Sequence, residues 1–143
     1  MNDKSLAQVI GPILGLVYVL VGIAGFFVTG FDNFFQDTDD ALLGFSLNPF
    51  HNVLHLAAGL FLVIMCTAFS APVAEGAVLG AGLALIVLFV LGVTAPDNLT
   101  ILSMNGEGDP ENFNHLVVGV TLLAVGLISS GQTQARLKRQ GLA

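Results

Sequence analysis

Three histidines stand out in this largely apolar sequence, because imidazole is the most common metal ligand among protein side chains. His51 and His55 are one helical turn apart, so on a helix they share a face, as metal-binding histidine pairs do. In a later segment, Glu111 takes the place relative to His115 that His51 takes relative to His55. Zinc and copper accept imidazole ligands, so one hypothesis is a divalent metal held by His51, His55, His115 and Glu111. The plain alternative is a hydrogen bond between histidine and glutamate.

Two of the histidines also fit the axial ligands of a haem. His55 lies about 10 Å along its helix from the expected N-cap, and His115 about 9 Å from its own, at 1.5 Å per residue. Imidazoles at one depth on facing helices can bind haem iron from opposite sides, and Gly59 and Gly119 would leave room for a porphyrin. Against this, no Lys or Arg lies nearby to meet the haem propionates. A haem b-binding electron-transfer protein with His55 and His115 as axial ligands is therefore the alternative hypothesis.

The favoured hypothesis is structural and requires no cofactor. Polar side chains recur on one face of each histidine-bearing segment: Asn48, His51, Asn52, His55, Asn112 and His115. Polar groups within a membrane turn toward the protein interior, where hydrogen bonds between helices contribute about 0.6 kcal/mol each. Small residues allow close approach of helices, and those expected to do so are Gly11, Gly15, Gly59, Gly76, Gly80 and Gly119.

Four apolar segments must position these side chains. They cover residues 9–28, 49–68, 74–94 and 110–130. Each has about twenty residues, which as a helix cross roughly 30 Å of hydrocarbon. Hydrophobic residues make up 55% of the chain and charged residues only 10%, against about 25% in soluble domains. The sequence therefore predicts an all-α, polytopic membrane protein, a bundle of four transmembrane helices in a single membrane domain, residues 1–143.

Charge placement predicts the orientation of this bundle in the cell membrane. The basic residues are confined to the ends of the chain: Lys4, Arg136, Lys138 and Arg139. The two long loops and the helix start that follows hold acids and no base: Asp32, Asp37, Asp39, Asp40, Asp97, Glu107, Asp109 and Glu111. Because basic ends stay in the cytoplasm, both termini and the short turn Ser70–Glu75 are expected there. A formal charge of −6 argues against nucleic acid, so the lipid bilayer is the predicted partner.

An internal repeat divides the chain into two helical hairpins. Asn52, His55, Leu56 and Gly59 form the pattern N-x-x-H-L-x-x-G, and the same pattern recurs from Asn112 to Gly119. The first and third segments match more weakly, through Gly11–Gly15 and Gly76–Gly80. Two hairpins that both begin inside would be related by an axis along the membrane normal. The alternative is coincidence, since Leu and Gly are common in this sequence.

These motifs resemble a family of small four-helix bacterial membrane proteins of unknown function. The resemblance rests on residues 48–59 and on the second N-x-x-H-L-x-x-G pattern, and it covers about Leu6 to Ser130. Members often carry an aspartate–asparagine pair before the last histidine, where this chain has Asn112, Phe113 and Asn114. The resemblance implies a fold and a membrane location, and it implies no reaction.

No hydrolase or nucleotide-binding motif accompanies the polar residues, since G-x-S-x-G, H-E-x-x-H and the P-loop are all absent from the sequence. The prediction is therefore a non-enzymatic structural or accessory membrane subunit, with no cofactor predicted and haem b as the alternative. A larger membrane complex or a homo-oligomer would supply its protein partners.

Overall fold

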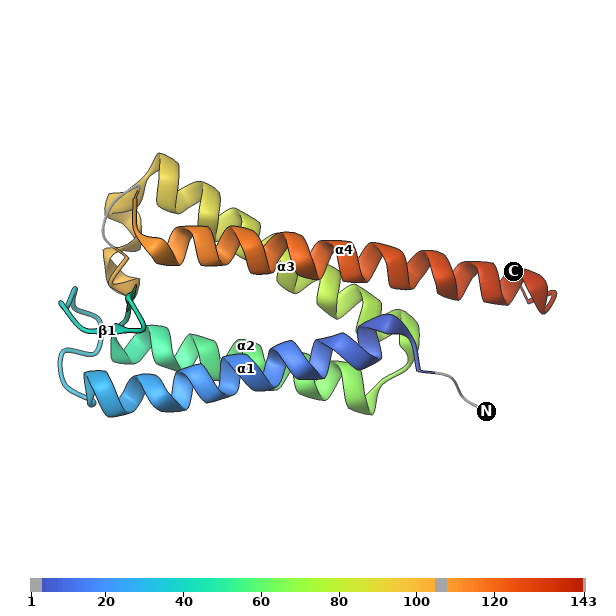
Figure 1. Cartoon of the computed structure of the whole chain (residues 1–143), viewed down its shortest axis with the longest axis horizontal. Coiled ribbons are helices and arrows are strands. Elements are labelled where there is room, and N and C mark those ends of the chain that lie inside the picture. The colour runs from blue at the N-terminus through green and yellow to red at the C-terminus, as the bar shows by residue number, and fades with distance from the viewer. Residues whose placement is uncertain (1–3, 105–107, 143) are drawn as a thin grey trace.

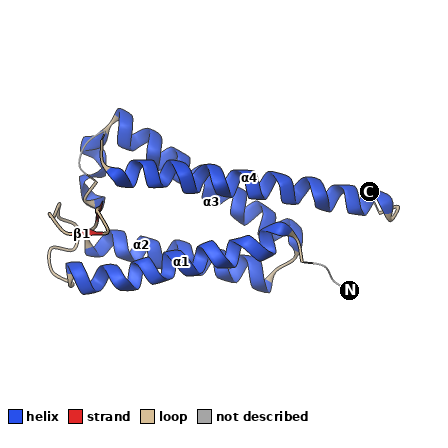
Figure 2. Ribbon diagram, viewed as in Figure 1, coloured by secondary structure: helices blue, strands red, loops and turns tan. Residues whose placement is uncertain are grey.

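The structure is a computed structural model that describes residues 4–104 and 108–142. Within these ranges the long helices are α1 (Leu6–Thr29), α2 (Pro49–Ala68), α3 (Ala71–Thr94) and α4 (Pro110–Arg139). Each is long and apolar enough to cross a membrane, and together they pack as a bundle (Figures 1 and 2). The predicted all-α, four-helix membrane fold is confirmed. Glu107, one of the acids used to predict orientation, lies outside the described residues.

The helix boundaries follow from local capping and extend three of the predicted segments. Ser5 caps α1 and forms a capping box with Gln8, so this helix begins before the apolar segment does. Helix α4 continues past residue 130 to Arg139, because its polar last turns remain good helix formers outside the apolar region. Arg136, Lys138 and Arg139 in the last turn complement the negative end of the helix dipole.

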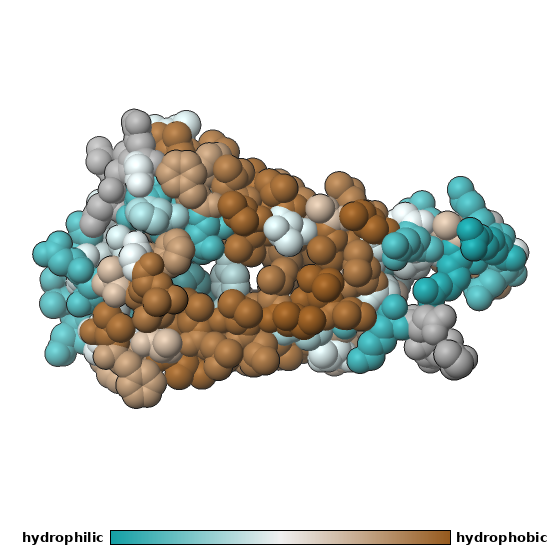
Figure 3. Space-filling model, viewed as in Figure 1, coloured by the Kyte–Doolittle hydropathy of each residue, from teal (hydrophilic) through white to brown (hydrophobic). Residues whose placement is uncertain are grey.

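The helices form two hairpins that lie side by side. Helix α1 packs mainly on α2, and α3 packs mainly on α4. Both chain termini and the α2–α3 turn lie at one end of the molecule, while the two long loops lie at the other (Figure 1). A broad apolar band separates two polar ends in the space-filling view (Figure 3), as a bilayer-spanning protein requires.

The long loops fold over the bundle and bind one another. Strands β1 (Ala41–Leu42) and β2 (Phe45–Ser46) pair as an antiparallel hairpin, and the 3-10 helix η1 spans Pro96–Leu102. The Ser103 hydroxyl accepts from the backbone N–H of Thr38 and donates to its carbonyl, each at 2.9 Å. The loop of residues 30–48 between α1 and α2, called loop one below, thus covers the helix ends at one mouth of the bundle.

Glycines bring the helices of each hairpin into backbone contact. A Cβ on Gly59 would lie 2.5 Å from the carbonyl oxygen of Gly15, and one on Gly82 would lie 2.9 Å from that of Gly119. Such distances exclude larger side chains, so the small-residue contact predicted for Gly15, Gly59 and Gly119 is present. Gly11 likewise faces the side chain of Cys66.

Two of the glycines predicted to pack between helices do not. A Cβ on Gly76 or Gly80 would meet no atom within 4 Å among the residues described. The counterpart of Gly15 in the second hairpin is Gly82, two residues beyond the position inferred from the sequence. Two residues turn a helix by about 200°, so Gly76 and Gly80 point away from α4.

We expect Gly59→Ala to lower the melting temperature in detergent, because the new methyl group would overlap the backbone of α1. Overpacking of this kind costs about 1–3 kcal/mol. Gly80→Ala is the matched control and should leave stability unchanged or raise it slightly, since its Cβ meets open space. Equal melting temperatures for the two variants would show that α1 and α2 do not approach this closely.

Candidate metal centre

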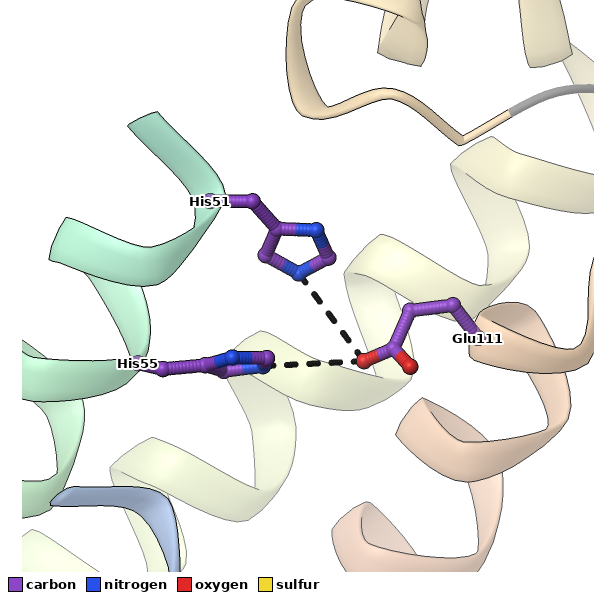
Figure 4. A group of neighbouring side chains, drawn as sticks. All are labelled: His51, His55 and Glu111. Carbon is purple, nitrogen blue, oxygen red and sulfur yellow. Dashed lines mark ion pairs between the residues drawn. The ribbon is translucent and has the colours of Figure 1, made fainter. Parts of the chain in front are cut away.

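Three imidazoles converge on one carboxylate at the mouth of the bundle that the long loops cover. His51 and His55 project from α2, and Glu111 reaches toward them from α4 (Figure 4). The Oε1 atom of Glu111 lies 3.8 Å from Nε2 of His51, 3.6 Å from Nε2 of His55 and 3.5 Å from Nε2 of His115. All four side chains are buried, and Glu111 is only 1% exposed. The site therefore joins the two hairpins through buried side chains.

Helices α2 and α4 hold their first site residues, His51 and Glu111, through the same capping arrangement. Each begins with a polar N-cap followed by proline, whose missing N–H is not needed in the first turn. The Asn48 side chain accepts from the N–H of His51, and Asp109 accepts from that of Glu111, each at 2.8 Å. The first site residue of each helix is thus fixed by its cap, and the histidine one turn later falls on the same face.

Asn48 also ties the start of α2 to the loops above it. Its amide nitrogen donates to the carbonyl of Gln36 at 2.9 Å and to that of Ile101 at 2.8 Å. One fully buried side chain therefore connects both long loops to the helix that carries His51.

The hydrogen bond of His51 determines which of its nitrogens faces Glu111. Nδ1 lies 2.9 Å from the carbonyl oxygen of Leu102. A carbonyl only accepts, so Nδ1 carries the proton, and in the neutral imidazole Nε2 presents a lone pair. That lone pair faces Oε1 of Glu111, which is also an acceptor and which already accepts from the Asn114 side chain at 3.1 Å. A proton or a metal ion between Nε2 and Oε1 would satisfy both acceptors.

The imidazole nitrogens lie farther from Oε1 of Glu111 than direct hydrogen bonds require, at distances closer to the spacing of ligand atoms around one ion. Values of 3.5 to 3.8 Å exceed the roughly 2.7–3.2 Å of an N–H···O bond. Ligand bonds of about 2.0–2.1 Å in a tetrahedron place neighbouring ligand atoms about 3.3–3.4 Å apart. The ligand atoms of His51, His55 and Glu111 all lie within 4.8 Å of one another. A divalent ion could bind these three with small side-chain adjustments, and His115 lies beside the same carboxylate.

The predicted polar cluster divides into two groups. The three histidines meet at Glu111, whereas the asparagines serve within single hairpins or at a cap. Asn52 donates to the Thr29 hydroxyl at 2.9 Å and packs on Gly25, while Asn112 packs on Gly92 in the other hairpin. These asparagines hold paired helices together and do not contribute to the carboxylate centre.

The sequence prediction missed a second buried carboxylate at the opposite end of the bundle. Glu75, which the sequence predicts in the turn between α2 and α3, lies inside α3 and is 4% exposed. Its oxygens accept from Ser129 at 2.9 Å, Ser130 at 3.4 Å and Thr133 at 2.6 Å. The hydroxyls on one side of α4 were the available signal. Because hydroxyl donors surround Glu75, no cation is needed there.

One comparison with known proteins identifies a relationship. A family model described as a domain of unknown function (DUF4383) matches residues 8–128, which is most of the chain. No curated protein and no solved structure matches this chain.

We expect Asn48→Ala to destabilise the protein by about 1–3 kcal/mol, because it removes a helix cap and two hydrogen bonds to loop carbonyl groups. Thermal unfolding in detergent measures the effect. Thr121→Ala is the control, since this exposed hydroxyl bonds only to its own helix at Val117. If both variants melt together, Asn48 does not hold the loops to α2.

Proposed function

This chain belongs to the DUF4383 family, a domain of unknown function. Membership in the family assigns no function, so we infer one from the chemistry of the site. Membership agrees with the resemblance found in the sequence, and the four spanning helices make the chain a small multi-pass membrane protein. We propose that it is a metal-binding membrane protein that holds one divalent transition-metal ion between its hairpins. The ligands are His51 and His55 from α2 and Glu111 from α4.

The observation that carries this proposal is that two buried hydrogen-bond acceptors, one on His51 and one on Glu111, face each other. Nε2 of His51 faces Oε1 of Glu111, while Nδ1 is committed to Leu102. A buried carboxylate without a counter-charge costs several kcal/mol or more, and an ion between the two acceptors removes that cost. A carbonyl acceptor on the remote nitrogen is also the usual partner of a metal-bound histidine.

The ligand chemistry favours zinc. Two imidazoles and one carboxylate are a known zinc set, and three protein ligands leave a fourth position for another group. Copper(II) prefers square-planar geometry, which ligands spread over two crossing hairpins supply less readily. An ion here would join α2 to α4, which suits the structural or accessory role predicted from the sequence.

The alternative cofactor, haem b between His55 and His115, has less support from the geometry. Both Nε2 atoms lie within 3.6 Å of a single oxygen of Glu111, so a carboxylate stands where the porphyrin would have to pass. The basic residues of the sequence lie toward the termini, at the far end from this mouth. A visible absorption spectrum separates the haem and metal-ion alternatives.

Purified protein stripped with a chelator and titrated with Zn²⁺ should bind one ion per chain and gain thermal stability on binding. His51→Ala, His55→Ala and Glu111→Gln should each weaken binding by about 100-fold or more, because each removes a ligand. His115→Ala is the matched control from the same cluster and should lose less than about tenfold. Binding should weaken on acidification, since protons compete for the imidazoles.

Unchanged zinc affinity in Glu111→Gln would contradict the proposal. A Soret band in the purified protein that is lost in both His55→Ala and His115→Ala would show that the site binds haem and not a single metal ion. Glu111→Gln is close to the native side chain in shape, so it should fold without metal and keep this test meaningful.

We further propose that the metal centre faces the outside of the cell membrane. The two ends of the bundle differ in charge, with basic residues near the termini and acids in the loops over the site. The positive-inside rule then places the termini in the cytoplasm. In this orientation the ion would be taken from outside the cytoplasm.

Single cysteines test this orientation, because the only native cysteine, Cys66, is buried. A membrane-impermeant thiol reagent applied to intact cells should label Asp39→Cys and Gly108→Cys, and it should label Gln140→Cys only after the membrane is opened. Labelling of Gln140→Cys alone in intact cells would reverse the orientation.

A further inference from the structure

A cavity next to the metal centre opens between the two hairpins. It has a volume of about 150 Å³ and is lined by apolar side chains of α1 and of loop one, among them Val17, Val21 and Leu42. His55, Glu111 and Asn114 form its polar wall. The space-filling view is hollowed between the hairpins in this region (Figure 3). A molecule in this cavity would therefore lie against two of the proposed metal ligands.

Tyr18 gives the cavity one hydrogen-bond donor. Its ring packs edge-on against His55, with ring centroids 5.2 Å apart at 89°. Tyr18 is only 8% exposed, yet its hydroxyl has no hydrogen-bond partner among the described residues. A buried hydroxyl without a partner costs free energy, and a ligand oxygen in the cavity would remove that cost.

Packing alone does not account for a tyrosine at this position. Tyr18 stands three residues after Gly15, and Leu85 stands three residues after Gly82, the counterpart of Gly15 in the other hairpin. Leucine packs at the equivalent place without a polar group. The hydroxyl is therefore a feature of the first hairpin alone.

The shape and chemistry of the cavity limit what it can hold. A cavity of this volume with apolar walls accommodates a benzene-sized ring. Two apolar residues that line the cavity, Val17 and Leu43, are 48% and 90% exposed, so apolar side chains flank its opening. Glu111 would repel an anion, and apolar walls disfavour any charge. An uncharged, lipid-soluble molecule fits these conditions.

We propose that this cavity binds a lipid-soluble, single-ring ligand whose carbonyl oxygen accepts a hydrogen bond from Tyr18. The inference deepens the proposed function and rests on it for one point, namely that the bound ring lies beside a metal ion. The cavity and the unpartnered hydroxyl stand without the metal.

Two probe molecules of matched shape test the proposal. 4-Fluoroacetophenone carries the carbonyl, and 1-ethyl-4-fluorobenzene lacks it. Saturable binding to protein in nanodiscs, measured by fluorine NMR against empty nanodiscs, should favour the ketone by about tenfold, within the range of one hydrogen bond. Tyr18→Phe should bind both probes with equal affinity, because it removes only the hydroxyl.

Two further variants locate the binding. Val21→Phe should fill the cavity and abolish binding of both probes, whereas Leu20→Phe, at a lipid-exposed position on the same helix, should bind as the parent does. Equal affinity of the parent for the two probes, or a preference that survives in Tyr18→Phe, would overturn the proposal. So would saturable binding that Val21→Phe leaves intact.

The measurements are made in metal-free and zinc-loaded protein, which separates the two proposals. Tyr18-dependent ketone binding without any zinc binding would contradict the metal centre and leave the cavity ligand in place. Zinc binding without ketone preference would contradict the cavity ligand and leave the metal centre in place.

Discussion

The negative charge of Glu111 is buried at the mouth of the bundle, and the proposed metal centre depends on how that charge is balanced. Glu111 is only 1% exposed, and a low local dielectric strengthens charge interactions within the site. Three imidazole nitrogens surround it, but at least one of them, on His51, presents a lone pair. In the proposed metal centre, a cation shared between this imidazole and the carboxylate would satisfy both acceptors.

The rest of the fold holds these atoms at fixed positions. Backbone contacts at Gly15–Gly59 and Gly82–Gly119 set the helix pairs, so each hairpin behaves as a stiff unit. Capped helix starts then fix His51 and Glu111 at the same level, and the loops close over them through Asn48. At the opposite end Glu75 joins α3 to α4 through hydroxyl donors. The hairpins are thus tied internally along their length and to one another at the mouth.

Much of this was predictable because membrane helices leave strong sequence signals. Apolar length gave the spans, and the i, i+4 spacing of His51 and His55 gave a shared face. Contacts between helices were harder to predict. A helical face shows which way a side chain points, but it does not show which residue of the neighbouring helix lies opposite. That limit explains the misplaced Gly76 and Gly80 and the missed Glu75, whose hydroxyl donors all come from another helix. The unpartnered hydroxyl of Tyr18 likewise appears only once the cavity beside it is known.

X-ray absorption at the zinc edge of reconstituted protein tests the central claim most directly, since it reports the atoms bound to the ion. The account predicts nitrogen and oxygen neighbours at about 2.0–2.1 Å with the scattering pattern of at least two imidazoles. It also predicts loss of that pattern when His51 and His55 are both replaced by alanine. A zinc shell without imidazole, or one unchanged by this double replacement, would contradict the proposal that Glu111 and the α2 histidines share a metal ion.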